Sequence, residues 1–483
     1  MVEIRPRRGS GQVEPPGCPP VLVSTTLESG NFLHSLPLEA MPNSAALRRS
    51  LLAPLLAPLA VLLLGGFSFV PPTPRVALQE ARAQQESFAE RETTAQEVVV
   101  IQNGNLVNVV DGTVAEGVSV VVEGRIIRSI EAAGFQPPAG ARVIDVEGRW
   151  ILPGFIDTHT HIRTLDAARR ALHSGVTTVR SSSVDAFQDV GIRELVRAGV
   201  LPGPDMVAAG IFVTQELGQA LLADPRLIPL AGGVNTHEEL RLLVQVNAER
   251  GVDVIKTRGT ERAGLPETDP RQQVYDEAQL RVVVEEAARH GLEVQAHAHG
   301  DEGARAAVRA GVRSIEHGTY LSRETLELMR ERGTYLVPTY STVVDLTQPG
   351  GDYDDPVLRV RGSHMLPRLA ETVRMAHEMG VPIATGADTS YGPESLLRIS
   401  HEVRRFVELG MTPMEALRSA TIVGAELLGL ADTTGSVEPG KEADLIVVER
   451  SPLQDIGSVE DVLVVVSNGQ VAVNRLPFGL GSR

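Results

Sequence analysis

The chain has 483 residues, 42% of them hydrophobic and 22% charged, which fits a globular protein of two or three domains with a sizeable core. Its formal net charge of −16 argues against the backbone of a nucleic acid as a partner. Because Cys18 is the single cysteine, an intramolecular disulfide is excluded, and the ligands of any metal must be His, Lys or carboxylate side chains.

Residues 1–95 are predicted to be an N-terminal extension that lies outside the fold. Residues 1–40 are rich in Pro, Gly and Ser and lack periodicity, so Met41 is a candidate for the true start of translation. Two arginines at 48–49 and the apolar run 51–64 follow it, in the order that is typical of a secretory signal peptide.

Cleavage of this signal is expected near residue 83, where Ala81 and Ala83 form a small-x-small site, and the residues up to 95 form a flexible lead. We therefore expect a secreted or periplasmic protein whose mature form has no membrane partner. An uncleaved anchor is the alternative, and it is disfavoured because Pro54 and Pro58 interrupt the apolar run.

Residues 96–152 are predicted to be rich in strands. Apolar runs such as 118–123 alternate with turns that contain glycine, which is the pattern of β-hairpins. Residues 431–483 return to this pattern with the runs 443–448 and 462–466. We expect the two ends of the mature chain to pair into one small β-sandwich.

Residues 153–430 alternate short apolar strands with amphipathic segments. Helices are predicted at 238–249, 277–289, 304–310, 323–332 and 413–428. Regular alternation over this length is typical of an α/β fold of the (β/α)8 TIM-barrel type. A doubly wound sheet is the alternative, but it would want a glycine-rich turn after the first strand, where His159 and His161 stand instead.

The first strand of this region ends in two histidines. The segment 152–161 reads Leu-Pro-Gly-Phe-Ile-Asp-Thr-His-Thr-His. On a strand, residues i and i+2 lie on the same face, so His159 and His161 point in the same direction. Two imidazoles that converge on one point predict a metal site, and the alternative is a polar surface strand.

Lys256 ends a later apolar run, 252–256. Lys256 and Lys441 are the only lysines of the chain, although Lys and Arg together number 45. A buried ammonium would be costly unless it is neutralised or paired. Unlike arginine, lysine can lose its proton and then be modified. The alternative is a side chain that snorkels at a strand end.

Three further apolar runs end in a side chain that can bind a metal. His297 ends the run 292–297, His317 ends the run 312–317, and Asp388 follows the run 381–387. In a barrel, the C-terminal ends of the strands gather at one rim. The side chains expected there are His159, His161, Lys256, His297, His317 and Asp388.

With these segments the chain resembles the amidohydrolase superfamily, specifically its imidazolonepropionase-like branch, which includes Xaa-Pro and Xaa-Arg dipeptidases. The resemblance covers about 96–475. It is carried by motifs at 153–161, 175–180, 254–256, 297–300, 315–318, 385–388 and 438–445. The chain departs from many relatives at 181–183 and 257–260, near the expected rim, so the resemblance does not transfer a substrate.

The resemblance implies a binuclear metal centre, with zinc as the expected metal. By it, His159, His161 and Asp388 bind one ion, and His297 and His317 bind the second. Lys256 would bridge the two ions as N6-carboxylysine, because carbon dioxide converts its repulsive ammonium into an anionic oxygen ligand. Lys441 resembles a lysine of the family with a structural role.

The implied reaction is hydrolysis of an amide or peptide bond in a dipeptide or N-acyl amino acid. A hydroxide that bridges the metals would attack the carbonyl, with Asp388 as general base and then general acid. A cyclic amide, a lactone or a phosphotriester is the alternative substrate, and a non-catalytic barrel scaffold is the alternative to an enzyme. The expected partner is a small molecule, and homo-oligomerisation is left open.

Five further residues are candidates for substrate contacts: Arg180, Arg258, His299, Tyr320 and Tyr340. The arginines suit a carboxylate anchor, with an ordinary salt bridge as the alternative. His299 could instead cap the helix after it, and each tyrosine could simply pack at the rim. Three long segments, 214–235, 259–275 and 341–367, are expected to form the mouth of the site.

Overall fold

The structure is a computed structural model, and it describes residues 97–476. The predicted signal peptide, the candidate start at Met41, the cleavage near residue 83 and the flexible lead lie outside the described residues. Among the described residues, every helix is too short or too polar to cross a lipid bilayer.

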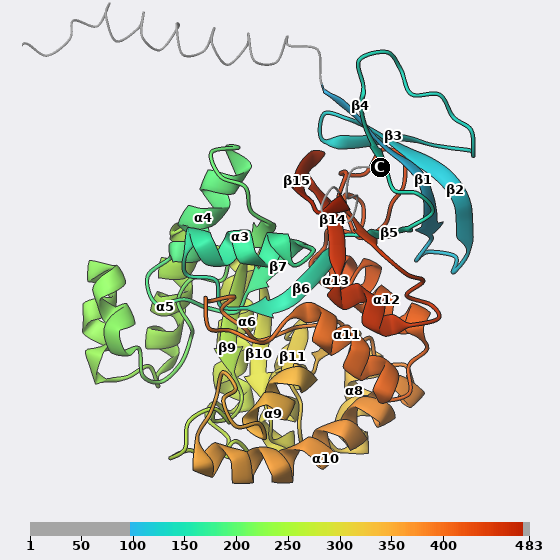
Figure 1. Cartoon of the computed structure of the whole chain (residues 1–483). Helices are drawn as coiled ribbons and strands as arrows, with labels where there is room; N and C mark the ends of the chain where they lie inside the picture. Colours follow the sequence, from blue (N-terminus) through green and yellow to red (C-terminus); the bar gives the residue numbers. More distant parts are fainter. Residues whose placement is uncertain (1–96, 477–483) are drawn as a thin grey trace, which may run out of the picture. The chain divides into compact units, whose positions relative to one another are not determined.

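Strands from both ends of the described chain share one mixed sheet of eight strands, in the order β15-β14-β13-β5-β1-β2-β3, with β4 paired to β1. Its members are β1 (Val98–Val107), β2 (Val114–Glu123), β3 (Ile126–Glu131), β4 (Arg142–Asp145), β5 (Trp150–Pro153), β13 (Leu445–Val448), β14 (Val462–Ser467) and β15 (Gln470–Asn474). Figure 1 shows the C-terminal strands beside the N-terminal ones.

The two ends meet where β5 and β13 pair antiparallel, with Leu152 opposite Ile446. One face of this sheet forms its own apolar cluster, which includes Ile101, Val120 and Val464, all fully buried. The expected pairing of the two ends is thus present in one sheet. The arrangement of that sheet as a sandwich stays a prediction.

The middle of the chain forms two parallel sheets, β6-β7-β8 and β12-β11-β10-β9. The first consists of β6 (Phe155–Thr160), β7 (Val176–Ser181) and β8 (Asp205–Val207). The second consists of β9 (Val254–Arg258), β10 (Glu293–Ala298), β11 (Ser314–His317) and β12 (Tyr335–Val337). Strands β6, β7, β9 and β11 are buried along their whole length, as expected for parallel strands that are covered by helices.

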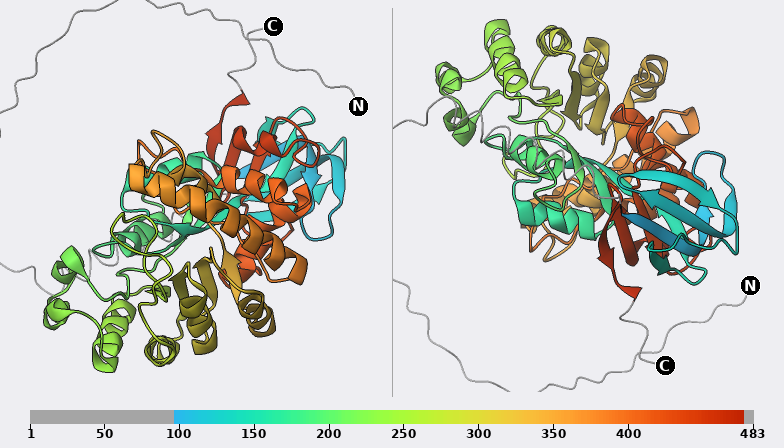
Figure 2. Two further views of the ribbon diagram at one scale, coloured as in Figure 1. Left: turned by 90° about the horizontal axis from the view of Figure 1, so that it is seen from below. Right: turned by 90° about the horizontal axis from the view of Figure 1, so that it is seen from above.

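Helices follow most of these strands, and Figure 2 shows them on the outside of the parallel strands. They are α3 (Leu165–His173), α4 (Gln188–Arg197), α5 (His237–Glu249), α6 (Glu277–Arg289), α7 (Asp301–Ala310), α8 (Arg323–Arg332), α9 (Tyr340–Leu346), α10 (Pro356–Met379), α11 (Ile399–Glu408), α12 (Pro413–Ser419) and α13 (Ile422–Leu427), with the 3-10 helices η1 (Gly218–Ala223), η2 (Pro225–Gly232) and η3 (Ile456–Glu460). The predicted α/β alternation is confirmed.

The helix predicted at 413–428 is in fact two helices. Helix α12 ends at Ser419, and Thr421, with φ −137° and ψ −100°, is the N-cap of α13, which begins at Ile422. The Thr421 hydroxyl donates to the carbonyl of Leu417 at 2.7 Å, which occupies an acceptor that a continuous helix would use. The break lets Gly424 lie against Ile156 of β6, where an added Cβ would be 3.1 Å from the Ile156 side chain.

Isolated parallel bridges lie at the edges of the two parallel sheets. Val213 pairs with Thr257 of β9, Ile383 pairs with Leu336 of β12, and Thr389 pairs with Thr160 of β6. The segment 383–389 therefore lies between β12 and β6. Gly386 permits this approach, because a Cβ there would be only 2.6 Å from the Cβ of His159.

Candidate metal centre

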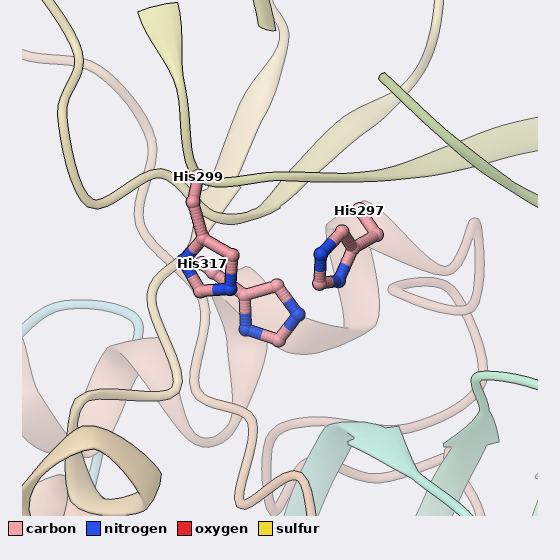
Figure 3. A group of neighbouring side chains, drawn as sticks. All are labelled: His297, His299 and His317. Carbon is pink, nitrogen blue, oxygen red and sulfur yellow. The ribbon is translucent and has the colours of Figure 1, made fainter. Parts of the chain in front are cut away.

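The ends of the parallel strands bring the predicted histidines together. Ligand atoms of His159, His317 and Asp388 all lie within 4.8 Å of one another, and so do those of His297, His299 and His317. Figure 3 shows the second group, whose ring centroids are 4.5 to 4.9 Å apart. His317 belongs to both groups, so the two groups form one continuous cluster.

His161 completes the cluster on the Asp388 side. Its Nε2 atom is 3.3 Å from Oδ1 of Asp388, and Nε2 of His159 is 3.6 Å from the same oxygen. Burial, the largest influence, would raise the pKa of Asp388, but the neighbouring His159, His161 and Lys256 outweigh it and lower the pKa to about 2. Asp388 is therefore a carboxylate at neutral pH.

Each imidazole has a hydrogen-bond partner on the nitrogen that faces away from the cluster. The contacts are His159 Nδ1 with Glu316 Oε2 (2.6 Å), His161 Nδ1 with the Ser183 carbonyl (2.9 Å), His317 Nδ1 with Thr339 Oγ1 (2.7 Å), His299 Nδ1 with Thr319 Oγ1 (2.8 Å) and His297 Nε2 with the Glu261 carbonyl (3.0 Å). The carboxylate and carbonyl partners can only accept, so they fix the tautomers of His159, His161 and His297 and leave the other nitrogen as a lone-pair donor toward the centre, whereas a threonine hydroxyl can donate or accept.

The buried imidazoles are neutral. Burial, reinforced by the charge of Lys256, lowers the pKa of His159 to about 4, and burial lowers the pKa of His299 to about 3. The pKa values of His297 and His317 lie well below the ordinary value, again mainly because of burial. Neutral imidazole is the form that binds a metal, so these side chains are in the protonation state that a bound cation requires.

Lys256 lines the same cavity as the histidine cluster. The residue is 2% exposed, and its Nζ has no hydrogen-bond partner among the described residues. The Phe212 ring lies 6.0 Å from Nζ. Burial lowers the pKa of Lys256 to about 8. An unsatisfied buried ammonium is costly to the folded state.

Arg180 belongs to the support of the cluster rather than to the substrate. Its guanidinium donates to Glu316 Oε1 at 2.8 Å, to Ser314 Oγ at 3.1 Å and to the Thr158 carbonyl at 2.7 Å. Both Arg180 and Glu316 are buried. The predicted role of Arg180 as a carboxylate anchor is therefore wrong, because Glu316 already occupies that guanidinium and in turn orients His159.

The backbone near the cluster is held by the buried Asp157, and two residues of the cluster have a left-handed backbone conformation. The Asp157 carboxylate accepts hydrogen bonds from the amides of His159 (3.1 Å) and Ala387 (3.0 Å) and from the Tyr391 hydroxyl (2.8 Å). It thereby ties β6 to the segment that carries Asp388. Asp388 and His317 have φ values of 46° and 75°, which are strained for side-chain-bearing residues and concentrate at functional sites.

Tyr340 lies at the start of α9, where a buried carboxylate from another helix holds the backbone. Glu402 of α11 accepts from the amides of Tyr340 and Ser341, each at 2.7 Å. These bonds fix Thr339, whose hydroxyl contacts His317. The start of α9 therefore has a structural role. The Tyr340 side chain packs against the main apolar core.

Glu402 gives a testable dependence of stability on pH. Burial raises the pKa of Glu402 from 4.5 to about 7, so the folded state binds the proton more tightly than the unfolded state. The associated stability is complete below pH 4.5 and is lost as the pH rises through 7. Between pH 4.5 and pH 8, wild type should lose up to about 3 kcal/mol of its free energy of unfolding through this group. The variant E402Q cannot titrate at this position and should lack this loss.

Urea unfolding of both proteins at pH 5 and pH 8 measures this difference. E415Q is the matched control, because hydrogen bonds from Thr412 lower the pKa of Glu415 and its pH dependence should have the opposite sign. Parallel pH profiles for wild type and E402Q would contradict the assignment.

The cluster lies in a cavity of about 1160 Å³. Its lining includes all six predicted metal ligands and two of the predicted substrate residues, Arg258 and His299. The alternative that His299 caps a helix is wrong, since the N-cap of α7 is Gly300 and, in the part of the chain that the structure describes, no side chain caps this helix. Tyr320 lines a separate cavity of about 320 Å³ instead.

The three predicted mouth segments all contribute to the large cavity. Two of them carry lining residues that the sequence did not single out, Arg262 and Tyr353. The charge of Asp388 and burial together raise the pKa of Tyr353, which keeps its phenol protonated. Neither residue lies on a periodic element, so the sequence held no signal that could have selected them.

Neutral imidazoles, a carboxylate and an unsatisfied lysine at the ends of parallel strands are the side chains expected in an α/β hydrolase that depends on a metal. The comparison with protein families narrows this class. The model of the amidohydrolase family matches residues 150–472, and the chain belongs to that family. The predicted resemblance, and with it the prediction of a hydrolase that acts on C–N bonds, is confirmed.

Individual relatives support the same conclusion. Ochratoxinase of Aspergillus niger is 28% identical over 394 residues, 72% of this chain and 80% of the relative. Imidazolonepropionase of Sphingopyxis alaskensis is 27% identical, over 70% of this chain and 87% of the relative. The crystal structure of a Xaa-Pro dipeptidase with bound methionine is 30% identical, with a TM-score of 0.70, and covers 78% of this chain and 99% of its own.

Proposed function

We propose that the protein hydrolyses the amide or peptide bond of a dipeptide or N-acyl amino acid, with two divalent cations, expected to be zinc, as its cofactor. The observation that carries the proposal is Lys256, whose Nζ is buried and has no hydrogen-bond partner within residues 97–476, and which lines the same cavity as the neutral imidazoles. A lone ammonium is unfavourable there, whereas an anionic oxygen ligand between two cations would be favourable.

The donor set suits this cofactor. His159, His161 and Asp388 would hold one ion, His297 and His317 would hold the second, and Lys256 would lie between them. Its pKa of about 8 leaves part of the amine neutral near neutral pH. The neutral Nζ can form an N–C bond with carbon dioxide and release one proton, which yields the N6-carboxylysine that the family resemblance implies.

When bound, the two cations would polarise the substrate carbonyl and lower the pKa of the attacking water. The chain supplies the proton transfers. Asp388 Oδ1, ionised and within 3.6 Å of two imidazole nitrogens, would accept a proton from the water and return it to the leaving amine. Glu316 keeps the proton of His159 on Nδ1, so that Nε2 faces the reacting groups.

We also propose that residues 153–430 form a closed (β/α)8 barrel, with residues 96–152 and 431–483 as a small sandwich. Closure is supported by the parallel bridges at 383 and 389, which link β12 to β6, and by the bridge from Val213, which follows β8 in the chain, to β9. We propose export to the periplasm or medium by a cleavable signal within residues 1–95, on the pattern of arginines and apolar residues there.

The test is a substrate screen of the purified protein combined with metal analysis. The screen contains dipeptides that end in Pro, Arg or a hydrophobic residue, several N-acyl amino acids, a lactone and a phosphotriester. We expect about two metal ions per chain, turnover of at least one dipeptide or N-acyl amino acid, and loss of that turnover with a chelator. A folded, metal-free protein, or turnover of the lactone or phosphotriester alone, would contradict the proposal.

A further inference from the structure

We propose that Arg262 binds the free carboxylate of the substrate, so that the enzyme selects amides of amino acids with an unblocked C-terminus. This inference rests on the proposed hydrolysis, and it names the residue that would bind the C-terminal carboxylate of the substrate. It replaces the sequence-based prediction of an anchor at Arg180 or Arg258.

The cations that line the large cavity are Arg163, Lys256, Arg258 and Arg262. Arg163 pairs with Asp185 at 3.2 Å. Arg258 pairs with Glu261 and also donates to Thr214 Oγ1 at 3.0 Å. Among the described residues, no carboxylate lies within 4.0 Å of the Arg262 guanidinium, so this is the lining arginine whose donors remain available for a ligand.

Arg262 lies close enough to the cluster to act on bound substrate. Arg262 is exposed, and it lines the same cavity as the histidine cluster and Asp388. A carboxylate held by Arg262 would therefore share this cavity with an amide carbonyl placed at the cluster.

The loop that carries Arg262 is pinned on both sides, which gives the side chain a defined starting point. Arg361 of α10 donates to the carbonyls of Ala263, Leu265, Pro266 and Thr268, and it has no carboxylate partner within 4.0 Å among residues 97–476. On the other side, the Glu261 carbonyl contacts His297. Restricting the loop reduces the ordering cost of binding.

The acidic residues around Arg262 limit where on the cavity rim a carboxylate can bind. Exposed acidic side chains, among them Glu267 and Asp352, also line the mouth. They disfavour an anion elsewhere on the rim, so a bound carboxylate would be oriented by Arg262. A guanidinium also offers two parallel donors that match the two oxygens of a carboxylate.

The test compares R262Q with wild type on a matched pair of substrates, the best dipeptide of the screen and its C-terminal carboxamide. For the acid, kcat/KM should fall about 100-fold in R262Q, mainly through KM, and R262K should recover part of it. For the carboxamide, kcat/KM should stay within about 3-fold. Equal losses for acid and carboxamide, or a wild type that does not prefer the acid, would overturn the inference.

R271Q is the control for removal of a positive charge from the same loop, because Arg271 is exposed and pairs with Asp269 at 2.8 Å. It should leave the preference for the acid unchanged. Calorimetric titration with N-acetyl-L-methionine and its amide separates the two proposals. If the screen yields no turnover but wild type binds the acid more tightly than the amide and R262Q does not, the hydrolytic function fails and the Arg262 site stands. Equal affinities of wild type for the acid and the amide would contradict the proposed carboxylate site at Arg262.

Discussion

Replacing Asp388 with asparagine is expected to lower kcat on the order of 10³-fold while the fold remains intact. The carboxylate is ionised, with a pKa of about 2, and its Oδ1 faces both His159 and His161. Asparagine has nearly the same shape but cannot accept the proton of the attacking water. The reaction would then lose its general base and the acid that protonates the leaving amine.

The backbone makes D388N a clean substitution. Asp388 has a φ of 46°, and asparagine is among the few residues that adopt this left-handed conformation readily. Stability measured by urea unfolding should therefore change little, and metal content should be determined for each preparation. D276N is a suitable control, because Asp276 is the exposed N-cap of α6 and asparagine caps equally well. If D388N kept more than about a tenth of the wild-type kcat at equal metal content, Asp388 would not be the base.

The residues that gather in the candidate metal centre could be predicted from the sequence because each follows a short apolar run. The C-terminal ends of parallel strands meet at one edge, so local patterns at 159, 256, 297, 317 and 388 were enough to predict the convergence. The α/β alternation was predictable for the same reason. The break between α12 and α13 was not, because it depends on the packing of Gly424 against β6, a contact between distant segments.

The substrate residues could not be chosen from the sequence because pairing decides which arginine is free. Arg180 is occupied by Glu316, which lies 136 residues away in the chain, and Arg258 by the nearby Glu261. A sequence pattern gives each arginine the same charge and a similar place at a strand end. Arg262 and Tyr353 lie in loops without periodicity, and only the folded chain shows that both line the cavity.

The supporting carboxylates were hidden for a similar reason. Asp157, Glu316 and Glu402 are each fully buried and each contact a residue or segment that carries a ligand. Two of them lie inside recognised motifs, yet a motif does not say which backbone amide or imidazole a carboxylate will meet. Buried carboxylates are tolerated only with several donors, and those donors come from other elements.

The second large effect is expected for Lys256, and its sign depends on whether metal is present. In the metal-free protein, K256M should raise the free energy of unfolding by about 1–3 kcal/mol, because methionine fills similar space without a buried, unpartnered amine. In the metal-supplied protein, K256M should bind fewer than two ions per chain and lose turnover on the order of 10³-fold or more, because the bridging anion cannot form.

Lys441, the other lysine of the chain, provides a matched control with the opposite expected sign. Its Nζ donates to the Ala431 carbonyl at 2.7 Å and to Ser436 Oγ at 2.6 Å, and it pairs with Glu438 at 3.2 Å. K441M should therefore destabilise the metal-free protein by about 1–3 kcal/mol and leave the metal content unchanged. Urea unfolding with a chelator, and metal analysis without one, measure both variants.

The pH dependence distinguishes a buried amine from a merely well-packed side chain. Burial lowers the pKa of Lys256 from 10.5 to about 8, so the unfolded chain binds the proton more tightly. Metal-free wild type should thus gain stability as the pH rises from 8 to 10.5, and K256M should lack this gain. If K256M instead destabilised the metal-free protein as K441M does, Lys256 would be an ordinary packed residue, and the argument for its conversion to an anionic ligand would fail.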